Sequence, residues 1–359
     1  MECVATFTAP YNLTKKELYE KVLSDIKAGN SSTINTDLYR AYCESLKRAV
    51  SGVLQSGEYG SRYFDMQQQL EANVSRFSAF KAYHATRLLQ ENEHPKIKKA
   101  ILNTFNRYQV AEYNTTVART RTAKQWNDFN ADPVSNELYP NIKWLPSRSA
   151  NPREEHRIFW GKVWAKDDPF WSENQPGNLW NCKCDWEETD EPATDGTYNY
   201  TPPAGLEGNP AETGEIFTDK ASYLKMSESR KEEVEKSTYN IARNESLKNA
   251  IGRLKDVIIE KKTSEGTIQV GFNRKGLEHF QYDFFPNKWT RDEILRTIDT
   301  VLKNAEYVAE ANCFKGNPMV DKFYYYKVTL LENEWFLNVR KLKNGRAYLY
   351  SMTDKIKKK

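Results

Sequence analysis

A histidine and two closely spaced cysteines are the first residues whose types suggest chemistry. His156 precedes the pair Cys182 and Cys184, and an imidazole with two thiolates suits zinc, which takes four tetrahedral ligands. A carboxylate would have to supply the fourth ligand, from Asp167, Asp168 or Asp185. Because only three ligands are visible and one residue separates the cysteines, we favour a structural knot in which His156 bonds backbone near the cysteine turn. A structural zinc site at the same three residues is the alternative.

A second group of residues, near the C-terminus, has the side chains needed to cleave RNA without a metal. His279 is the natural base for the ribose 2′-hydroxyl, which attacks the adjacent phosphate. Arg340 and Lys327 would stabilise the transition state, and Ser351 would orient the phosphate or relay a proton. Three more side chains are expected to contact the substrate: Asn338, Tyr348 and Thr353. The alternative is that these residues form an ordinary solvent-facing surface without catalytic function, because one face of an antiparallel sheet is commonly polar.

A hairpin must position this second group. The dipeptide Asn344-Gly345 is a strong signal for a two-residue turn. With Lys343 opposite Arg346, the open face would carry three pairs: Arg340 with Leu349, Asn338 with Ser351, and Phe336 with Thr353. The core face would carry Trp335, Leu337, Val339, Tyr350 and Met352. An even-length turn at 332–334 would keep Lys327 on the open face, which we expect because burying an unpaired lysine is costly.

The first third of the chain has the hydrophobic spacing of helices. Thr14 and Glu17 form a capping box before a first helix. Longer helices are expected over about 36–55, 62–92 and 97–129.

The C-terminal third mixes helices and strands. A charged helix is expected over about 227–260, and a second should begin at Thr290 with Glu293 as its capping box. The apolar face of this second helix consists of Ile294, Ile298, Val301 and Leu302. Strand patterns cover 267–272, 323–331, 335–342 and 346–353.

Composition divides the chain into four parts. Residues 1–130 form a helical region, and residues 131–186 form a tryptophan-rich module that we expect to be a compact aromatic core. Residues 187–219 are rich in proline, glycine and acidic side chains and read as a linker. Residues 220–359 follow as an α+β domain with an antiparallel sheet. The predicted fold class is therefore multidomain α+β.

Charge differs strongly between these parts. The net charge of +4 over 359 residues would not by itself indicate a partner. Residues 185–219, however, carry 10 acidic and no basic side chains, whereas the pieces before and after are basic. The last piece ends in Lys357, Lys358 and Lys359, either as a solvated end or as part of a nucleic-acid-binding surface.

Several classes of protein do not fit the sequence. No apolar run approaches the roughly 20 residues that cross a bilayer, and the N-terminus lacks the pattern of a secretory signal. We therefore expect synthesis in a cytoplasm without a membrane span. The five cysteines, at positions 3, 43, 182, 184 and 313, are too sparse for a disulfide framework.

The block around His156 resembles a known family. Downstream of His156 come Gly161, the run Asp168-Pro169-Phe170-Trp171, the turn Pro176-Gly177-Asn178, and Cys182-Lys183-Cys184. This order is similar to that of the Mu F-like minor head proteins of tailed phages, the head-morphogenesis family. Lys183 stands where the family usually has arginine. The resemblance covers about 108–223.

The resemblance implies a role in building phage heads. Its expected partners are the portal, scaffold and major capsid proteins. Its expected location is the bacterial cytoplasm during assembly and then the virion interior.

The C-terminal order of helix, histidine segment, helix and antiparallel meander resembles the phage-borne barnase, EndoU, colicin and RelE ribonuclease group. These domains are often fused behind Mu F-like heads. The resemblance implies a metal-independent, toxin-like ribonuclease acting on RNA, with no cofactor for catalysis. Two alternatives remain. One is a structural minor capsid protein whose basic C-terminal domain binds nucleic acid without cutting it, and the other is a polymorphic toxin delivered by the Mu F-like module and neutralised by an immunity protein.

Overall fold

The computed structural model describes residues 15–31, 33–194, 196, 198–281, 285–312 and 317–356. They belong to two compact units. Unit 1 comprises Met1–Gln55 and Gln69–Tyr239, and unit 2 comprises Ser56–Gln68 and Asn240–Lys359. Some residues used in the sequence predictions lie outside the described residues: Cys3, Thr14, Cys313 and the lysines 357–359.

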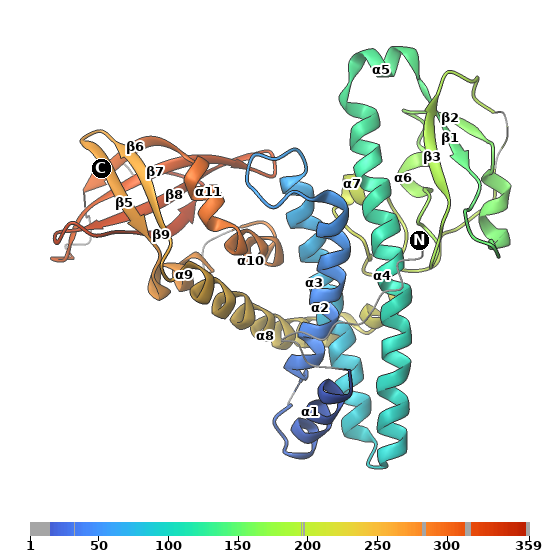
Figure 1. The fold of residues 1–359 in the computed structure, drawn as a ribbon, viewed down its shortest axis with the longest axis horizontal. Coiled ribbons are helices and arrows are strands. Elements are labelled where there is room, and N and C mark those ends of the chain that lie inside the picture. The colour runs from blue at the N-terminus through green and yellow to red at the C-terminus, as the bar shows by residue number, and fades with distance from the viewer. Residues whose placement is uncertain are drawn as a thin grey trace. The chain divides into compact units, whose positions relative to one another are not determined.

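Long helices dominate the first half of unit 1, as the hydrophobic spacing predicts (Figure 1). They are α1 (Lys15–Lys27), α2 (Thr36–Leu54), α3 (Phe64–Glu91), which begins in unit 2, and α4 (Pro95–Ala131). The Asn35 side chain caps α2 by accepting from the amides of Asp37 and Leu38. His94 caps α4, and Pro95 occupies its first turn, where the missing amide hydrogen is not needed.

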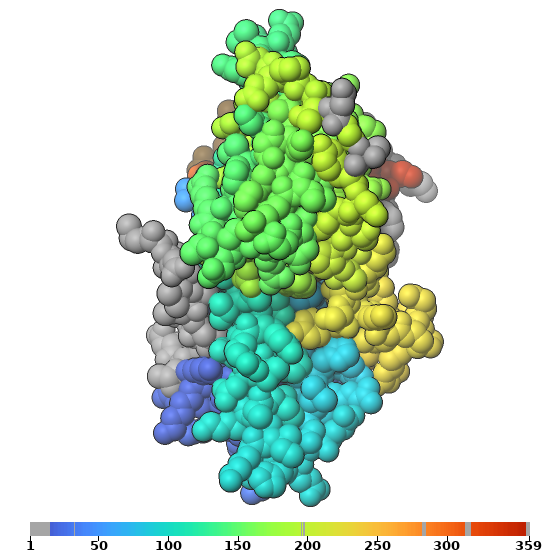
Figure 2. Space-filling view, turned by 90° about the vertical axis from the view of Figure 1, so that its right-hand side faces the viewer, coloured from blue at the N-terminus to red at the C-terminus, as the bar shows by residue number. Residues whose placement is uncertain are grey.

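The tryptophan-rich module of unit 1 is built on a small antiparallel sheet in the order β2-β1-β3. Its elements are α5 (Pro133–Leu138), β1 (Asn141–Leu145), the 3-10 helix η2 (Glu154–Phe159), β2 (Val163–Ala165), α6 (Phe170–Glu173) and β3 (Asp185–Thr189). Its buried core consists of Ile142, Trp144, Phe159, Trp164, Trp171 and Trp186. The expected aromatic core is therefore confirmed. Figure 2 shows the green surface of this module lying directly against the teal surface of α4.

The acidic segment that follows contains only short helices. They are α7 (Pro210–Thr213) and the 3-10 helix η3 (Ser222–Leu224). The helix α8 (Glu228–Leu254) then begins in unit 1 and ends in unit 2. The predicted continuation of this helix to residue 260 is wrong, because the apolar run of Ile258 and Ile259 starts a strand.

Unit 2 contains a six-stranded sheet in the order β4-β5-β9-β8-β7-β6. Its strands are β4 (Ile258–Thr263), β5 (Gly266–Gly271), β6 (Glu306–Asn312), β7 (Val320–Leu330), β8 (Asn333–Leu342) and β9 (Ala347–Thr353). The sheet is antiparallel except between β5 and β9, which run parallel, with Val270 opposite Ala347. Strands β4 and β6 were not predicted.

Three short helices accompany this sheet: α9 (Arg274–Phe280), α10 (Lys288–Arg296) and α11 (Ile298–Asn304). The predicted capping box at Thr290 is wrong. Asn287 caps α10 by accepting from the amides of Trp289 and Thr290, so the helix starts earlier. The predicted apolar face is confirmed, because Ile294, Ile298, Val301 and Leu302 are all buried in the core of unit 2.

The hairpin β8–β9 has a different register near its turn from the predicted one. Arg340 lies opposite Tyr348 and Val339 opposite Leu349, whereas Asn338 lies opposite Ser351 and leaves Tyr350 as a β-bulge. The turn holds one more residue than a two-residue loop, and the bulge restores the predicted pairing beyond it. Leu349 is therefore a core residue, and Tyr350 is not on the core face, contrary to prediction.

The hairpin β7–β8 confirms the even-length turn. Leu330 lies opposite Asn333, so two residues form the turn, and Lys327 lies opposite Phe336 on the open face. Both turn residues, Leu331 and Glu332, have positive φ, as a tight hairpin turn requires. None of the helices in the described parts of the chain combines the length and apolarity that crossing a bilayer requires.

Candidate functional site

The His156 and cysteine group comes together at one end of the tryptophan-rich module. His156 lies on η2, and the cysteines lie on the turn that leads into β3. Asn181 starts this turn with a positive φ of 57°. One ligand atom from each of His156, Cys182 and Cys184 lies within 4.8 Å of the other two. The sequence prediction that these three residues meet is therefore matched by the geometry.

The His156 ring is fixed by side chains rather than by backbone. Its Nε2 lies 2.9 Å from the Tyr200 hydroxyl, and its Nδ1 lies 3.4 Å from Cys182 Sγ. The edge of the ring packs against Trp144, with centroids 5.1 Å apart. The predicted hydrogen bond from His156 to backbone near the cysteine turn is not found, because Tyr200 and Cys182 take both ring nitrogens. Tyr200 was not predicted from the sequence.

The two thiols of this group interact. The interaction with Cys182, followed by that with His156, lowers the pKa of Cys184 to about 5, although burial opposes it. The backbone amide of Cys184 donates to Cys182 Sγ over 3.4 Å. The same interaction, together with burial, raises the pKa of Cys182, so this corner of the module stabilises one thiolate, on Cys184.

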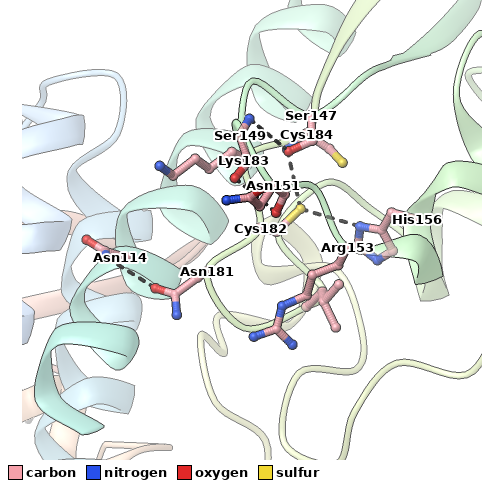
Figure 3. A pocket seen from close by; sticks show the side chains of 11 residues that line it. Asn114, Ser147, Ser149, Asn151, Arg153, His156, Asn181, Cys182, Lys183 and Cys184 are labelled. Carbon is pink, nitrogen blue, oxygen red and sulfur yellow. Dashed lines mark hydrogen bonds between the residues drawn. The ribbon is translucent and has the colours of Figure 1, made fainter. Parts of the chain in front are cut away.

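A cavity of about 310 Å³ opens beside the two sulfurs. Figure 3 shows its lining side chains, which come from the loop before η2, η2 itself, the cysteine turn with the residues just before it, and α4: Asn114, Ser147, Ser149, Asn151, Arg153, His156, Leu179, Asn181, Cys182, Lys183 and Cys184. The cavity beside the two sulfurs is thus lined mainly by polar side chains.

The carboxylates expected to complete a metal shell are not part of the cluster among the described residues. Asp185 accepts from Arg148 over 2.6 Å and from Gln125 over 3.2 Å. Asp168 instead accepts from the amide of Phe170, the first residue of α6, over 2.8 Å. Asp185 and Asp168 thus have structural roles.

Helix α4 holds the cysteine turn through polar contacts. The Thr115 hydroxyl accepts from the Asn181 amide over 3.1 Å, and the Asn114 side chain donates to that of Asn181 over 3.1 Å. One turn further along α4, Arg119 is fully buried and donates to Asn178 over 2.5 Å. Sequence reasoning missed Arg119, since an arginine in a polar helix normally reads as a surface residue.

The second predicted group meets on the open face of the six-stranded sheet of unit 2. The His279 ring on α9 packs against the ring of Tyr350, with centroids 4.4 Å apart. The Arg340 guanidinium lies over the same ring, 4.5 Å from its centroid. The structure therefore brings His279 and Arg340 to one aromatic side chain. Both are partly exposed.

The other predicted residues of this group lie along the same face. Tyr348 is opposite Arg340, Asn338 is opposite Ser351, and Thr353 is opposite Phe336. Lys327, on β7, is the other strand partner of Phe336 and forms an ion pair with Glu334. Phe336 and Arg340 are four residues apart on β8. Lys327, as the partner of Phe336, therefore lies about 13 Å along the strands from Arg340. Ser351 is only 7% exposed. The sheet thus places Arg340 on the ring that His279 contacts, Tyr348 opposite Arg340, and Lys327 and Thr353 further along the face.

The region around the His156 and cysteine group defines a class of protein. Residues 46–187 match the family model described as Phage Mu protein F like protein. This region includes α4, the tryptophan-rich module and the cysteine turn, and it begins well before the block on which the sequence resemblance rests. The chain therefore carries a Mu F-like region, as predicted. No curated protein and no solved structure matches the chain significantly.

Proposed function

We propose that the protein is a phage or prophage minor head morphogenesis protein whose C-terminal domain is a metal-independent ribonuclease. The Mu F-like match over residues 46–187 supports the first half of this proposal. In this role the protein acts with portal, scaffold and major capsid proteins, first in the bacterial cytoplasm and then inside the virion.

One observation carries the ribonuclease half: His279 and Arg340 pack against the same Tyr350 ring. Because both groups contact one side chain, we expect the imidazole and the guanidinium to act on a single phosphodiester. Both come from well-ordered elements, because α9 is capped by Asn273 and Arg340 lies within β8. Fixed groups lower the cost of ordering the site during the reaction.

The proposed reaction is transesterification within RNA. His279 takes the proton of a ribose 2′-hydroxyl, and the 2′-oxygen attacks the adjacent phosphorus. Arg340 stabilises the charge that develops on the phosphorane. The 5′-oxygen then leaves and takes a proton from solvent, which yields a 2′,3′-cyclic phosphate and a 5′-hydroxyl. No cofactor takes part.

The remaining residues take supporting roles in this proposal. Tyr348, opposite Arg340, contacts the nucleotide being cleaved. Lys327, Asn338 and Thr353 lie further along the face and suit the neighbouring phosphates and bases. Ser351 lies opposite Asn338 and is nearly buried, so it suits a supporting role in the sheet rather than a contact to phosphate.

The test uses the full-length chain with bulk RNA in EDTA. Wild type is expected to cleave RNA and leave cyclic-phosphate ends, and H279A is expected to lose cleavage by about 100-fold or more while it still binds RNA in a gel-shift assay. R340Q is expected to lose a similar factor. H94N and R346Q are matched controls, because Asn can replace His94 as the cap of α4 and Arg346 is exposed.

The outcomes separate the alternatives. Wild type that binds RNA without cutting it, or H279A that cuts as fast as wild type, contradicts the ribonuclease proposal. Binding without cleavage would favour the structural capsid protein that contacts nucleic acid. Cleavage that a neighbouring acidic protein suppresses would favour the polymorphic toxin with an immunity partner.

A further inference from the structure

Three potential metal ligands converge in the Mu F-like region. They come from two segments of the chain, and one ligand atom from each of His156, Cys182 and Cys184 lies within 4.8 Å of the others. Tetrahedral zinc, with bonds of 2.0–2.3 Å, separates its ligand atoms by about 3.3–3.8 Å. A small contraction of the cluster is therefore enough to seat the ion.

The hydrogen bonds of Tyr200 fix the tautomer of His156. The Tyr200 hydroxyl donates its only hydrogen to the carbonyl oxygen of Asn178 over 3.0 Å. It must then accept from His156 Nε2 over 2.9 Å, so Nε2 carries the proton. The Nδ1 lone pair is left pointing at Cys182 Sγ, 3.4 Å away. A metal-binding histidine has this arrangement, with one nitrogen free to bind and the other held by a hydrogen bond.

The surroundings favour a soft metal ion. His156 is 1% exposed and Cys182 is 9% exposed. The amide of Cys184 donates to Cys182 Sγ, which holds this sulfur at the cluster. Two sulfurs and one imidazole select zinc or a similar thiophilic ion over magnesium or calcium, which prefer oxygen ligands.

The fourth position is open to solvent. Among the described residues, no aspartate or glutamate joins the cluster. The cavity of about 310 Å³ is lined by both cysteines and also by Ser147, Ser149 and Asn151. The neutral oxygens of these side chains can hold a water molecule by hydrogen bonds (Figure 3).

We propose that His156 Nδ1, Cys182 Sγ and Cys184 Sγ bind one zinc ion, with water as the fourth ligand. The ion joins η2 to the start of β3 and so closes this end of the tryptophan-rich module. The proposal does not depend on the ribonuclease activity, because every ligand lies in unit 1.

The test measures metal in the full-length chain purified under reducing conditions. Wild type is expected to contain about one zinc per chain. After replacement with Co(II), it is expected to show sulfur-to-cobalt charge transfer in the near ultraviolet and the intense visible bands of a tetrahedral site. Absence of both zinc and these bands overturns the proposal.

Variants locate the site. C182S, C184S and H156N are expected to lose the charge-transfer band or weaken metal binding at least 10-fold, while C43S, in the buried cysteine of α2, keeps both. A wild-type spectrum in the C182S/C184S double variant overturns the proposal. Circular dichroism of each variant shows whether it is folded.

Tyr200 provides a second, independent measurement. Y200F removes the acceptor of the Nε2 hydrogen and is expected to weaken zinc binding about 10–100-fold without removing a ligand. Y198F is the matched control, because Tyr198 packs on the same Phe159 ring but lies outside the hydrogen bond to His156. Equal zinc affinity in Y200F and Y198F would contradict the proposed role of Nδ1.

Discussion

Arg119 ties the long helix α4 to the chain that follows the cysteine turn. Its guanidinium donates to the carbonyl oxygens of Leu206, Glu207, Gly208 and Glu215 over 2.6–3.3 Å, and to the side chain of Asn178. Burial lowers the pKa of Arg119 to about 9, so the side chain still carries its charge at neutral pH. The five acceptors replace the water that a buried cation loses.

Replacing this arginine tests its role. A lysine has one ammonium group instead of a planar fork, and it cannot reach all five acceptors. We expect R119K to lower the free energy of unfolding of unit 1 by about 2–4 kcal/mol, because buried carbonyls lose their donors. Urea unfolding followed by tryptophan fluorescence measures this, since seven of the nine tryptophans lie in unit 1.

R121K is the control for this measurement. Arg121 lies two residues further along α4 and is exposed, so its replacement should change stability by less than about 0.5 kcal/mol. Equal effects of R119K and R121K would show that the buried hydrogen bonds contribute nothing specific.

Among the elements, α9 decides where His279 lies. The helix follows β5 and packs against β9, and Gly276 is the residue at the contact. A Cβ at this position would lie 2.1 Å from the carbonyl oxygen of Leu349. Only glycine allows the helix this close, and the approach is what brings the His279 ring onto Tyr350.

Changing Gly276 should therefore be costly. We expect G276A to displace α9 and to destabilise unit 2 by about 1–3 kcal/mol, because the clash is with backbone and cannot be relieved by a side chain. G252A is the matched control, since Gly252 lies within α8 in the same unit and a Cβ there would meet nothing within 4 Å. There, alanine should stabilise by about 0.5–1 kcal/mol.

Hydrogen exchange of the β8 and β9 amides measures the stability of unit 2 in both variants. Faster exchange in G276A and slower exchange in G252A are expected. A G276A variant with wild-type protection would mean that α9 can pack against β9 at a greater distance.

The same hairpin shows what the sequence could and could not predict at this scale. The alternation of side chains gave the strands, and the dipeptide Asn344-Gly345 gave the turn. The bulge at Tyr350 could not be predicted, because Leu349 and Tyr350 are adjacent and both suit a core, so the sequence does not mark which of them faces it. Because of this bulge, Tyr350, which was expected in the core, contacts His279 and Arg340 instead.

At the scale of the whole molecule, local signals were again more informative than distant ones. Spacing within short segments predicted the helices of unit 1 and the aromatic core. The meeting of His156 with the two cysteines, at least 26 residues away, was predicted from residue type, because an imidazole and two thiols suit one metal ion. Tyr200 and Arg119 were missed, because their partners lie at least 22 residues away in sequence and no local pattern marks them. The assignment of residues 56–68 to unit 2 was missed for the same reason.

Residues 56–68 belong to the folded core of unit 2. The Tyr59 hydroxyl donates to the Thr329 carbonyl over 3.1 Å and accepts from the Thr329 amide over 2.9 Å. Asp65 accepts from the Leu331 amide over 2.9 Å at the turn between β7 and β8. Phe64 is buried in the apolar core of unit 2 at 3% exposure. A fragment that begins after this segment would lack part of its own core.

Two phenylalanines on α3 distinguish the units. Phe64 packs in the core of unit 2, whereas Phe77 stacks on Phe217 in unit 1, with centroids 4.0 Å apart. We expect F64A to lower the stability of unit 2 by about 3–5 kcal/mol and F77A to lower that of unit 1 by a similar amount, because each leaves a cavity in a different core. Hydrogen exchange should show loss of protection in β7 and β8 for F64A, and in β1 and β3 for F77A. If each variant loosened both sets of amides equally, the two cores would unfold as one, and Phe64 would not stabilise unit 2 specifically.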